Sequence, residues 1–455
     1  MSNDERRGEQ PGRSGGRLVS RGGRSAGDEP GLATRSVHAG TEPDPATGAR
    51  AQPLYRTTSY VFESADDAAE RYALDAPGHV YSRISNPTVE SLEARMAALE
   101  GGAGAVATDS GMAALDALTF VLAGTGDNVV AARDCYGGTA AYFSHTASRR
   151  GVDVRFVDTL DYDAYAEAID DRTASVHVET IANPTLLTPE FDRLADIAHD
   201  AGVPLVVDNT FATPALCRPI EHGADIVWES TTKWLHGGGT TLGGVVVDGG
   251  TFPWAEHADR FPEIGGDNPA YRSVNFSTDF PDAPLAAAVR YRALRSLGGA
   301  QSPTDAWDTL GRIESLPARM ERHCENAAAV ASFLDDHPDV AWVAYPGLQA
   351  HPTHEEASQY LGDGYGGVVT FGLAGGFETG KRLCESVDLV SFLANIGDAK
   401  TLLIHPASTT HGQLSEEERR DAGVEPDLLR LSVGIEDPDD VIADLEAGIA
   451  EATHT

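Results

Sequence analysis

The chain has 455 residues, of which 41% are apolar and 23% are charged, and its 70 acidic and 34 basic side chains give a formal net charge of −36. This apolar content excludes disorder over most of the chain, and no run of about 18 apolar residues predicts a membrane-spanning helix. The strong negative charge argues against nucleic acid as the main partner, because phosphate binding needs a basic surface.

Lysine is nearly absent from the basic residues. Only Lys233, Lys381 and Lys400 are lysines, and the other basic residues are arginines. Acidity combined with arginine in place of lysine favours a halophilic source, because salt screens the repulsion of a highly charged surface. The four cysteines form no paired metal motif, and the N-terminal residues contain no apolar stretch typical of a secretory signal. We therefore expect a cytoplasmic protein with reduced thiols.

Residues 1–30 are rich in glycine and arginine and contain almost nothing apolar, which predicts a disordered tail. Regular patterns begin at Asn86, where Asn-Pro-Thr predicts the start of a helix that ends at Gly101-Gly102. A short strand at 105–108 and a helix at 111–123 follow. Further strands are expected at 128–131, 154–157, 175–179, 204–207, 225–228 and 244–247, with helices such as 162–170 and 190–201 between them.

Several of these strands are continuous runs of Val, Ile and Ala, as expected for strands buried on both faces of a sheet. Their alternation with helices predicts an α/β domain with a mostly parallel sheet. Residues 251–303 are aromatic and rich in Pro and Gly. A long helix at 313–337 and strands near 340–344 and 367–372 then indicate a separate, smaller α+β domain.

Chemically useful residues follow three of the predicted strands. Strand 105–108 is followed by Asp109-Ser110-Gly111-Met112 at a helix start, where N–H groups can bind a phosphate. Strand 204–207 is followed by Asp208, and strand 225–228 by Ser230-Thr231-Thr232-Lys233. Because ligands of open α/β sheets bind beyond the carboxyl ends of strands, we expect these residues on one rim.

A phosphate-binding turn, a carboxylate and a lysine are together what pyridoxal phosphate requires of a protein. Each element alone has an ordinary explanation: the lysine as a solvated loop residue, the aspartate as a helix cap, and the Ser-Gly pair as a turn. The joint order of the three along the sheet, in a chain with so few lysines, favours the cofactor.

Nine motifs then occur in a fixed order, at residues 53–60, 81–88, 110–113, 136–139, 179–184, 208–210, 230–233, 405–411 and 430–436. They resemble the Cys/Met-metabolism family of pyridoxal-phosphate enzymes, whose fold is the aspartate-aminotransferase-like fold type I. The resemblance runs from about residue 33 to the end. It implies an arm at 31–90 that contributes to a neighbouring subunit's site, a large cofactor-binding domain at 91–300 and a C-terminal domain at 301–455.

The resemblance implies a role for each matching residue. Lys233 would hold the cofactor as a Schiff base and move protons, Asp208 would pair with the ring nitrogen, and Tyr136 would stack on the ring. Arg430 would grip the substrate carboxylate, assisted by Asn183 and Ser408. The phosphate ligands implied are Ser110, Gly111, Met112, Ser230 and Thr232, with Tyr81 and Arg83 reaching in from the neighbouring subunit. Tyr55, also from the neighbour, would assist proton transfer or departure of the leaving group, so the site implies a homo-oligomer, expected to be a tetramer.

Two positions discriminate among subgroups of this family. In family members that handle cysteine or cystathionine, the stretch that resembles 395–402 typically has a glutamate that meets the distal amine. This chain has Lys400 there, which we interpret as a substrate filter. Methionine γ-lyases have a cysteine where this chain has Gly138. Both differences favour the O-acetylhomoserine sulfhydrylase type, in which sulfide or methanethiol replaces acetate to give homocysteine or methionine. The alternatives are cystathionine γ-synthase or γ-lyase, O-succinylhomoserine sulfhydrylase, and a catalytically dead scaffold.

Two other patterns are rejected. His351-Pro352-Thr353-His354-Glu355 places two histidines three residues apart, but it matches neither order of the zinc-protease motifs and is interpreted as a surface loop. Gly102-Ala103-Gly104-Ala105-Val106-Ala107 fits a dinucleotide-binding fingerprint by letter, but it precedes its strand instead of following it. We expect no metal site, and small molecules as the substrates.

Overall fold

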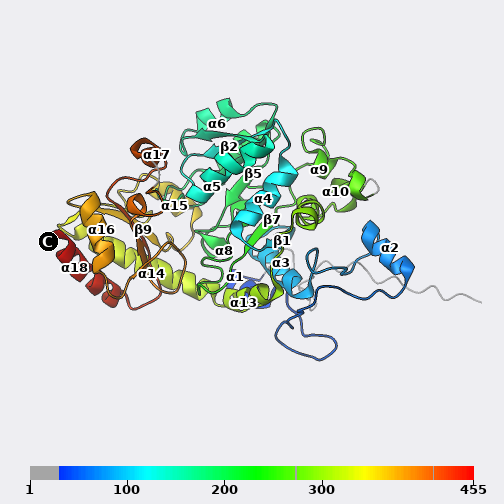
Figure 1. Ribbon diagram of the computed structural model, residues 1–455, viewed down its shortest axis with the longest axis horizontal. Coiled ribbons are helices and arrows are strands. Elements are labelled where there is room, and N and C mark those ends of the chain that lie inside the picture. The colour runs from blue at the N-terminus through cyan, green and yellow to red at the C-terminus, as the bar shows by residue number, and fades with distance from the viewer. Residues whose placement is uncertain (1–29, 272–273, 413–414, 455) are drawn as a thin grey trace, which may run out of the picture.

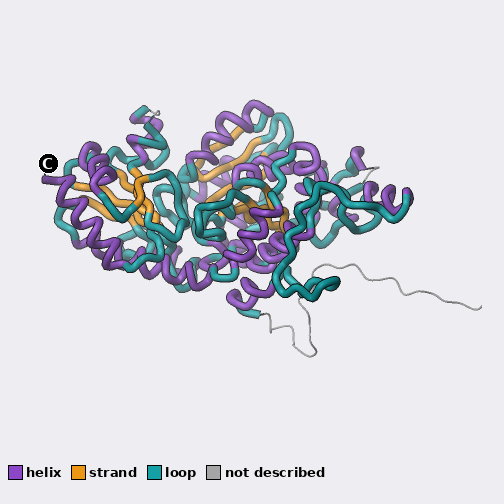
Figure 2. Tube along the Cα trace, turned by 60° about the horizontal axis from the view of Figure 1, so that its bottom comes forward, coloured by secondary structure: helices purple, strands orange, loops and turns teal. Residues whose placement is uncertain are grey.

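A computed structural model describes residues 30–271, 274–412 and 415–454. Nearly all of the predicted tail, residues 1–30, therefore lies outside the described residues. The structure contains a larger and a smaller β-sheet, each covered by helices, and the two groups of strands are seen side by side in Figure 2.

The larger sheet has seven strands in the order β1-β7-β6-β5-β4-β2-β3, and all of them are parallel except β7, which runs antiparallel to β1 and β6. This confirms the α/β fold class, and each strand expected in this region lies within two residues of its predicted bounds. The strands are β1 (Gly104–Thr108), β2 (Asn128–Ala132), β3 (Asp153–Val157), β4 (Thr173–Glu179), β5 (Leu205–Asp208), β6 (Ile226–Glu229) and β7 (Gly244–Asp248).

The two faces of this sheet are buried in two different apolar clusters. Along β5, Leu205 and Val207 pack on one face and Val206 packs on the other, because successive side chains of a strand point in opposite directions. The first face is covered by α3, α6 and α7, and the second by α4. The helices up to the end of this sheet are α1 (Leu32–His38), α2 (Ala65–Ala73), α3 (Pro87–Glu100), α4 (Gly111–Leu122), α5 (Gly137–Ala141), α6 (Tyr162–Ala168), α7 (Phe191–Asp200) and α8 (Thr213–Leu216).

Helix α3 begins and ends as its sequence predicts. The Asn86 side chain accepts a hydrogen bond from the Thr88 N–H, Pro87 occupies the first turn, and Gly101 takes the left-handed conformation that closes the helix. Residues 251–303 form short helical pieces, because their Pro and Gly residues interrupt longer ones. These are α9 (Pro262–Gly265), α10 (Phe276–Asp279), α11 (Pro284–Ala288) and α12 (Arg295–Leu297), with a π-helical turn at Val289–Leu294.

The single long helix expected at 313–337 is confirmed as α14 (Leu316–Asp336), which begins three residues later than predicted. A separate helix, α13 (Pro303–Ile313), ends just before it, and Pro317 lies in the first turn of α14. Proline has no N–H for an intrahelical bond, which suits it to a helix start and not to a helix interior.

The smaller sheet has the order β10-β11-β12-β9-β8, with only the β10–β11 pair parallel. Its elements are β8 (Val340–Ala344), β9 (Val368–Leu373), β10 (Ser391–Phe392), β11 (Leu402–Ile404), β12 (Leu428–Ser432), α15 (His354–Tyr360), α16 (Phe377–Ser386), α17 (Glu416–Asp421) and α18 (Pro438–His454). Helices α14, α16 and α18 pack with this sheet around an apolar cluster that is separate from those of the larger sheet.

The segment before α3 extends away from both sheets, and α2 lies at its far end (Figure 1). Its exposed apolar side chains are Leu54, Tyr55, Val61, Tyr72 and Tyr81. Within the described residues, no helix is long and apolar enough to cross a membrane, and no three His, Cys, Asp or Glu side chains are grouped as metal ligands. His351, expected in a surface loop, is instead buried.

Candidate active site

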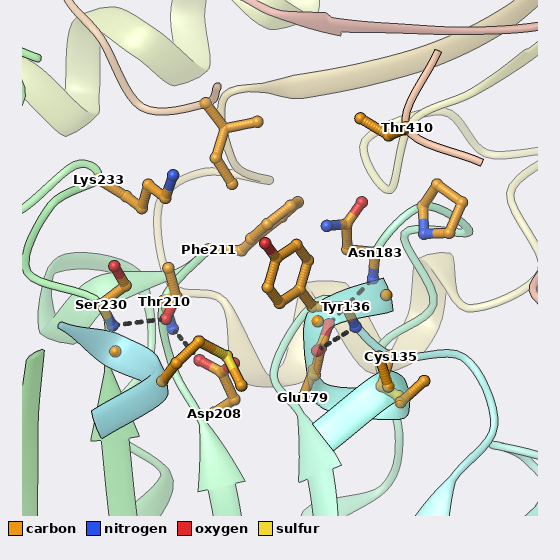
Figure 3. A pocket seen from close by; sticks show the side chains of 18 of the residues that line it. Cys135, Tyr136, Glu179, Asn183, Asp208, Thr210, Phe211, Ser230, Lys233 and Thr410 are labelled. Atoms are coloured by element: carbon orange, nitrogen blue, oxygen red, sulfur yellow. Dashed lines mark hydrogen bonds between the residues drawn. The ribbon is translucent and has the colours of Figure 1, made fainter. Parts of the chain in front are cut away.

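A cavity of about 790 Å³ lies at the carboxyl ends of the parallel strands. Its floor comes from the larger sheet, and part of its wall comes from the segments around Asn395 and Thr410 next to the smaller sheet. Figure 3 shows Lys233, Tyr136 and Asn183 facing one space, with Asp208 and Glu179 at the strand ends below. Ten predicted site residues line this cavity: Ser110, Gly111, Met112, Tyr136, Asn183, Asp208, Ser230, Thr232, Lys233 and Arg430.

The N-terminus of α4 opens into this cavity. Ser110 caps the helix through its side chain, which accepts from the Ala113 N–H at 3.2 Å. The N–H groups of Gly111 and Met112 are in the first turn, where a helix offers donors without intrahelical partners. Gly111 packs tightly on Ser230, because a Cβ there would lie 2.8 Å from the Ser230 Cβ. Glycine thus brings the helix terminus and the serine together as an anion site.

Asp208 ends β5 and is almost fully buried. Its Oδ1 accepts a hydrogen bond from the Thr210 N–H at 2.9 Å, and the Thr210 hydroxyl accepts from the Ser230 N–H at 2.9 Å. Burial raises the pKa of Asp208 to about 7. A carboxylate in this position stays ionised beside a cation, as the protonated ring nitrogen of a bound cofactor would be.

Glu179 organises two cavity residues, and sequence reasoning assigned it no role. One of its carboxylate oxygens accepts from the Tyr136 N–H at 2.6 Å, and the other accepts from the Asn183 N–H at 3.0 Å (Figure 3). Burial, with the negative charge of Asp208, raises the pKa of Glu179. The sequence did offer a signal for a role of Glu179 in the site. Glu179 ends β4, and it pairs in register with Asp208 at the end of the neighbouring strand β5.

Lys233 follows β6 and projects its amine into the cavity (Figure 3). Its Nζ donates a hydrogen bond to Asn395 Oδ1 at 2.5 Å. Burial, with a smaller effect of the positive charge of Arg430, lowers the pKa of Lys233 to about 8. The amine is therefore within reach of its neutral, nucleophilic form near neutral pH.

Arg430 lies on β12 and reaches the cavity from the smaller sheet. Its Nη1 donates to Asn183 Oδ1 at 3.1 Å, and its Nε is buried with no hydrogen-bond partner among the described residues. Burial lowers the pKa of Arg430 to about 10. A buried guanidinium that no carboxylate of the described residues contacts is suited to bind an anion from outside the chain, such as an amino-acid carboxylate.

Five predicted site residues do not line this chain's cavity, and three of them come from the N-terminal part of the chain: Tyr55, Tyr81 and Arg83. These three lie in or beside the extended segment before α3. The Tyr55 hydroxyl donates to Asp44 Oδ2 at 3.1 Å, and the Arg83 guanidinium lies over the Tyr81 ring and donates to the Arg295 carbonyl. The sequence predicts that these residues lie in the site of a neighbouring subunit. The structure of a single chain does not test this prediction.

Ser408 and Lys400 also lie outside the cavity lining. The Ser408 hydroxyl is hydrogen-bonded to His405 Nδ1 at 2.8 Å, while its neighbours Thr410 and His411 line the cavity instead. The Lys400 side chain is 70% exposed and lies 3.5 Å from Asp398. The geometry of this chain therefore gives no support to Lys400 as a substrate filter, because its charge points into solvent.

The cavity contains other residues that sequence reasoning did not assign, among them Asn395 and His411. Both are far from Lys233 in sequence, so no local pattern could pair them with it. His411 is the last residue of the 405–411 motif, and its proximity to Gly137 arises only in the folded chain. The Thr232 hydroxyl is partly engaged, because it accepts from the Gly243 N–H at 3.0 Å.

These residues fit pyridoxal phosphate. The N-terminus of α4 with Ser230 suits the phosphate, buried Asp208 suits the ring nitrogen, and Lys233 has an amine of lowered pKa above them. Among the residues that the structure describes, the buried Nε of Arg430 has no hydrogen-bond partner and is available to the substrate. Fold and site together define a pyridoxal-phosphate-dependent enzyme of fold type I.

Comparison with known proteins agrees with this class. The family model described as "Cys/Met metabolism PLP-dependent enzyme" matches residues 33–450. The chain is 48% identical to a homocysteine synthase of Schizosaccharomyces pombe, over 92% of this chain and 98% of the relative. It is 45% identical to O-acetyl-L-homoserine sulfhydrylase 1 of Thermus thermophilus, over 92% of this chain and 99% of the relative.

A solved structure from Campylobacter jejuni, assigned as an O-acetylhomoserine (thiol)-lyase, is 37% identical with a TM-score of 0.89, over 92% of this chain and 99% of that one. That crystal structure contains N'-pyridoxyl-lysine-5'-monophosphate, a lysine joined to the cofactor. The chain belongs to the Cys/Met-metabolism family of PLP-dependent enzymes. Its cofactor is pyridoxal phosphate.

Proposed function

We propose that the protein catalyses replacement of the acetate of O-acetyl-L-homoserine by sulfide or methanethiol. A C–S bond forms at Cγ as the C–O bond to acetate breaks, giving homocysteine or methionine plus acetate. The observation that carries this proposal is that Lys233 and Arg430 line one cavity, so a single amino-acid substrate can meet both the amine and the guanidinium. The relatives at 43–48% identity, named homocysteine synthase and O-acetyl-L-homoserine sulfhydrylase, support the choice of substrate.

Bound pyridoxal phosphate supplies an electron sink, which lets protons leave Cα and Cβ and the substituent leave Cγ. The chain supplies the rest. Arg430 binds the substrate carboxylate as a two-pronged donor, and Asn183 holds that guanidinium. Lys233 Nζ accepts and returns the protons at Cα and Cβ, for which a pKa of about 8 is suitable. Asp208 would stabilise the protonated ring nitrogen of the cofactor, and Tyr136, which lines the same cavity, would stack on its ring.

Gly138 supports this subgroup. A Cβ at position 138 would collide with the Tyr136 ring, so any larger residue would displace the tyrosine from its place over the cavity. The cysteine of the methionine γ-lyase pattern would therefore require a different position of this ring. A glycine keeps the space in front of Tyr136 open for a small sulfur nucleophile.

A substrate panel tests the reaction. We expect O-acetylhomoserine with sulfide or methanethiol to give homocysteine or methionine, measured by mass spectrometry together with released acetate. O-succinylhomoserine, cystathionine and methionine should be much poorer, and Lys233→Ala should abolish turnover without unfolding the protein. Faster turnover of O-succinylhomoserine or cystathionine would replace the proposal with one of those activities.

We also propose that the protein is a homotetramer in the cytoplasm. Each chain would have an arm at 31–90, a large domain at 91–300 and a C-terminal domain at 301–455. The arm would bring Tyr55, Tyr81 and Arg83 to the site of a neighbouring subunit. The exposed apolar side chains of the arm support burial against another copy. Light scattering measures the mass directly. A shared site is tested by mixing two inactive variants, Lys233→Ala and Arg83→Ala.

In a mixed pair of subunits, one of the two shared sites has both residues intact. Refolding the variants together should therefore restore roughly a quarter of wild-type activity. Refolding each variant alone is the control and should restore none. An inactive mixture of correct mass would show that Arg83 does not act across subunits.

A further inference from the structure

The amine of Lys233 is held from outside its own part of the chain. Its Nζ lies 2.5 Å from Oδ1 of Asn395, which sits between β10 and β11 beside the smaller sheet. Asn395 also lines the cavity. We propose that Asn395 is a positioning residue, whose amide oxygen orients the Lys233 amine whenever that amine is not bonded to the cofactor. The role of Lys233 in this proposal rests on the proposed function.

The segment that carries Asn395 is pressed against the lysine. Gly397 has φ +72°, and a Cβ there would lie 2.6 Å from the Trp234 N and 2.9 Å from the Lys233 carbonyl carbon. Only glycine adopts this conformation at such a close approach without strain. The segment that carries Asn395 is therefore held in place by close contact with the backbone of Lys233 and Trp234.

The same segment is anchored to the strand of the substrate-binding arginine. The Gly397 N–H donates to the Ser432 hydroxyl at 2.9 Å. Ser432 lies two residues after Arg430 on β12, so the two side chains project from the same face of the strand. The smaller sheet thus supplies the hydrogen-bond acceptor of the lysine and also the nearby positive charge of Arg430.

An amide oxygen is suited to this position because it accepts a hydrogen bond without carrying a charge. A carboxylate there would strongly favour the ammonium form of the lysine and hold its pKa up. Burial and Arg430 instead lower the pKa of Lys233 to about 8. Asparagine orients the amine and leaves that lowered pKa in place.

The test uses the scarcity of lysine. In the full chain freed of cofactor, acetic anhydride labels Lys233, Lys381 and Lys400, and peptide mass spectrometry measures each as a function of pH. We expect Asn395→Leu to move the midpoint of Lys233 labelling down by about 0.5 pH unit, because the ammonium loses its acceptor. Asn395→Asp should move it up by about 1 unit or more, because it gains an opposite charge.

Leu393→Ala, an exposed neighbour on the same segment, is the matched control and should leave the Lys233 midpoint unchanged. Labelling of Lys381 and Lys400 should be the same in all variants, which separates a local effect from a loosened fold. A wild-type midpoint in Asn395→Leu would overturn the proposal. If that variant does not fold, Asn395→Asp decides in the same way, by a shift or by its absence.

The labelling requires neither substrate nor turnover. A shifted midpoint together with no reaction in the substrate panel would reject the proposed function and retain the role of Asn395. An unchanged Lys233 midpoint in the Asn395 variants, together with an active enzyme, would reject the role of Asn395 and retain the proposed function.

Discussion

Two buried carboxyl groups, those of Glu100 and Glu229, lie next to residues that line the cavity or their immediate neighbours. Glu229 precedes Ser230, and Glu100 accepts a hydrogen bond at 2.8 Å from the side chain of Asn209, which follows Asp208. Burial raises the pKa of Glu100 to about 7, and burial together with the nearby Glu100 raises the pKa of Glu229. Both groups therefore keep protons in the folded protein over a pH range where an exposed glutamate loses them.

This pair predicts a stability that depends on pH. In the unfolded chain both groups ionise near their ordinary pKa of 4.5, so above that pH unfolding releases the protons that the folded protein retains, up to about pH 7 for Glu100. Stability contributed by each group is complete below pH 4.5 and falls by about 1.4 kcal/mol per pH unit above it. Glutamine cannot ionise, so Glu229→Gln should gain stability relative to wild type between pH 5 and pH 7.5.

Thermal unfolding midpoints at the two pH values measure this gain. The exposed Glu321→Gln on α14 is the control and should differ from wild type equally at both. An equal difference at pH 5 and pH 7.5 for Glu229→Gln would show that Glu229 is ionised in the folded protein.

At the scale of elements, the turn at Gly397 connects the smaller sheet to the lysine. Gly397→Ala forces a left-handed backbone onto alanine and places a methyl group against the Lys233–Trp234 backbone. We expect a cost of about 1–3 kcal/mol in stability and an activity loss of at least about tenfold, because the amine loses its acceptor.

Gly311→Ala is the matched control for this substitution. Gly311 lies inside α13, and a Cβ there meets nothing within 4 Å. Alanine should stabilise this helix by up to about 1 kcal/mol and leave turnover unchanged. If the two variants behaved alike in turnover and unfolding midpoint, the close packing at Gly397 would not matter to the site.

Local signals predicted the elements well where one residue decides the conformation. Asn86 and Gly101 bound α3 as expected, and the buried strands of the larger sheet follow their Val and Ile runs. The long helix expected at 313–337 forms as α14, but it begins at Leu316, because Pro317 suits the first turn of a helix and not its interior.

At the scale of the whole molecule, the net charge of −36 predicts a dependence on salt. Repulsion among carboxylates destabilises the compact state, and molar salt screens it. We expect the unfolding midpoint to rise between low salt and molar KCl. A midpoint that stays constant or falls would remove the prediction of a halophilic source.

Site residues that directly follow strands of the larger sheet were predictable from the sequence. Contacts between distant segments of the chain were not. Lys233, Asp208 and the α4 terminus follow strands of one sheet, so their convergence follows from the fold class. The contact of Lys233 with Asn395 spans 162 residues. It depends on how the smaller sheet packs on the larger one, which no periodicity records.

Strand β12 also fixes the distance between two residues of the site region. Arg430 and Ser432 are two residues apart in extended backbone, so about 7 Å of covalent chain fixes their separation. One added or deleted residue between them would turn one of the two side chains to the opposite face of the sheet. Loop insertions before Leu428 or after Ser432 would leave that spacing intact, so length variation should be tolerated around this strand and not within it.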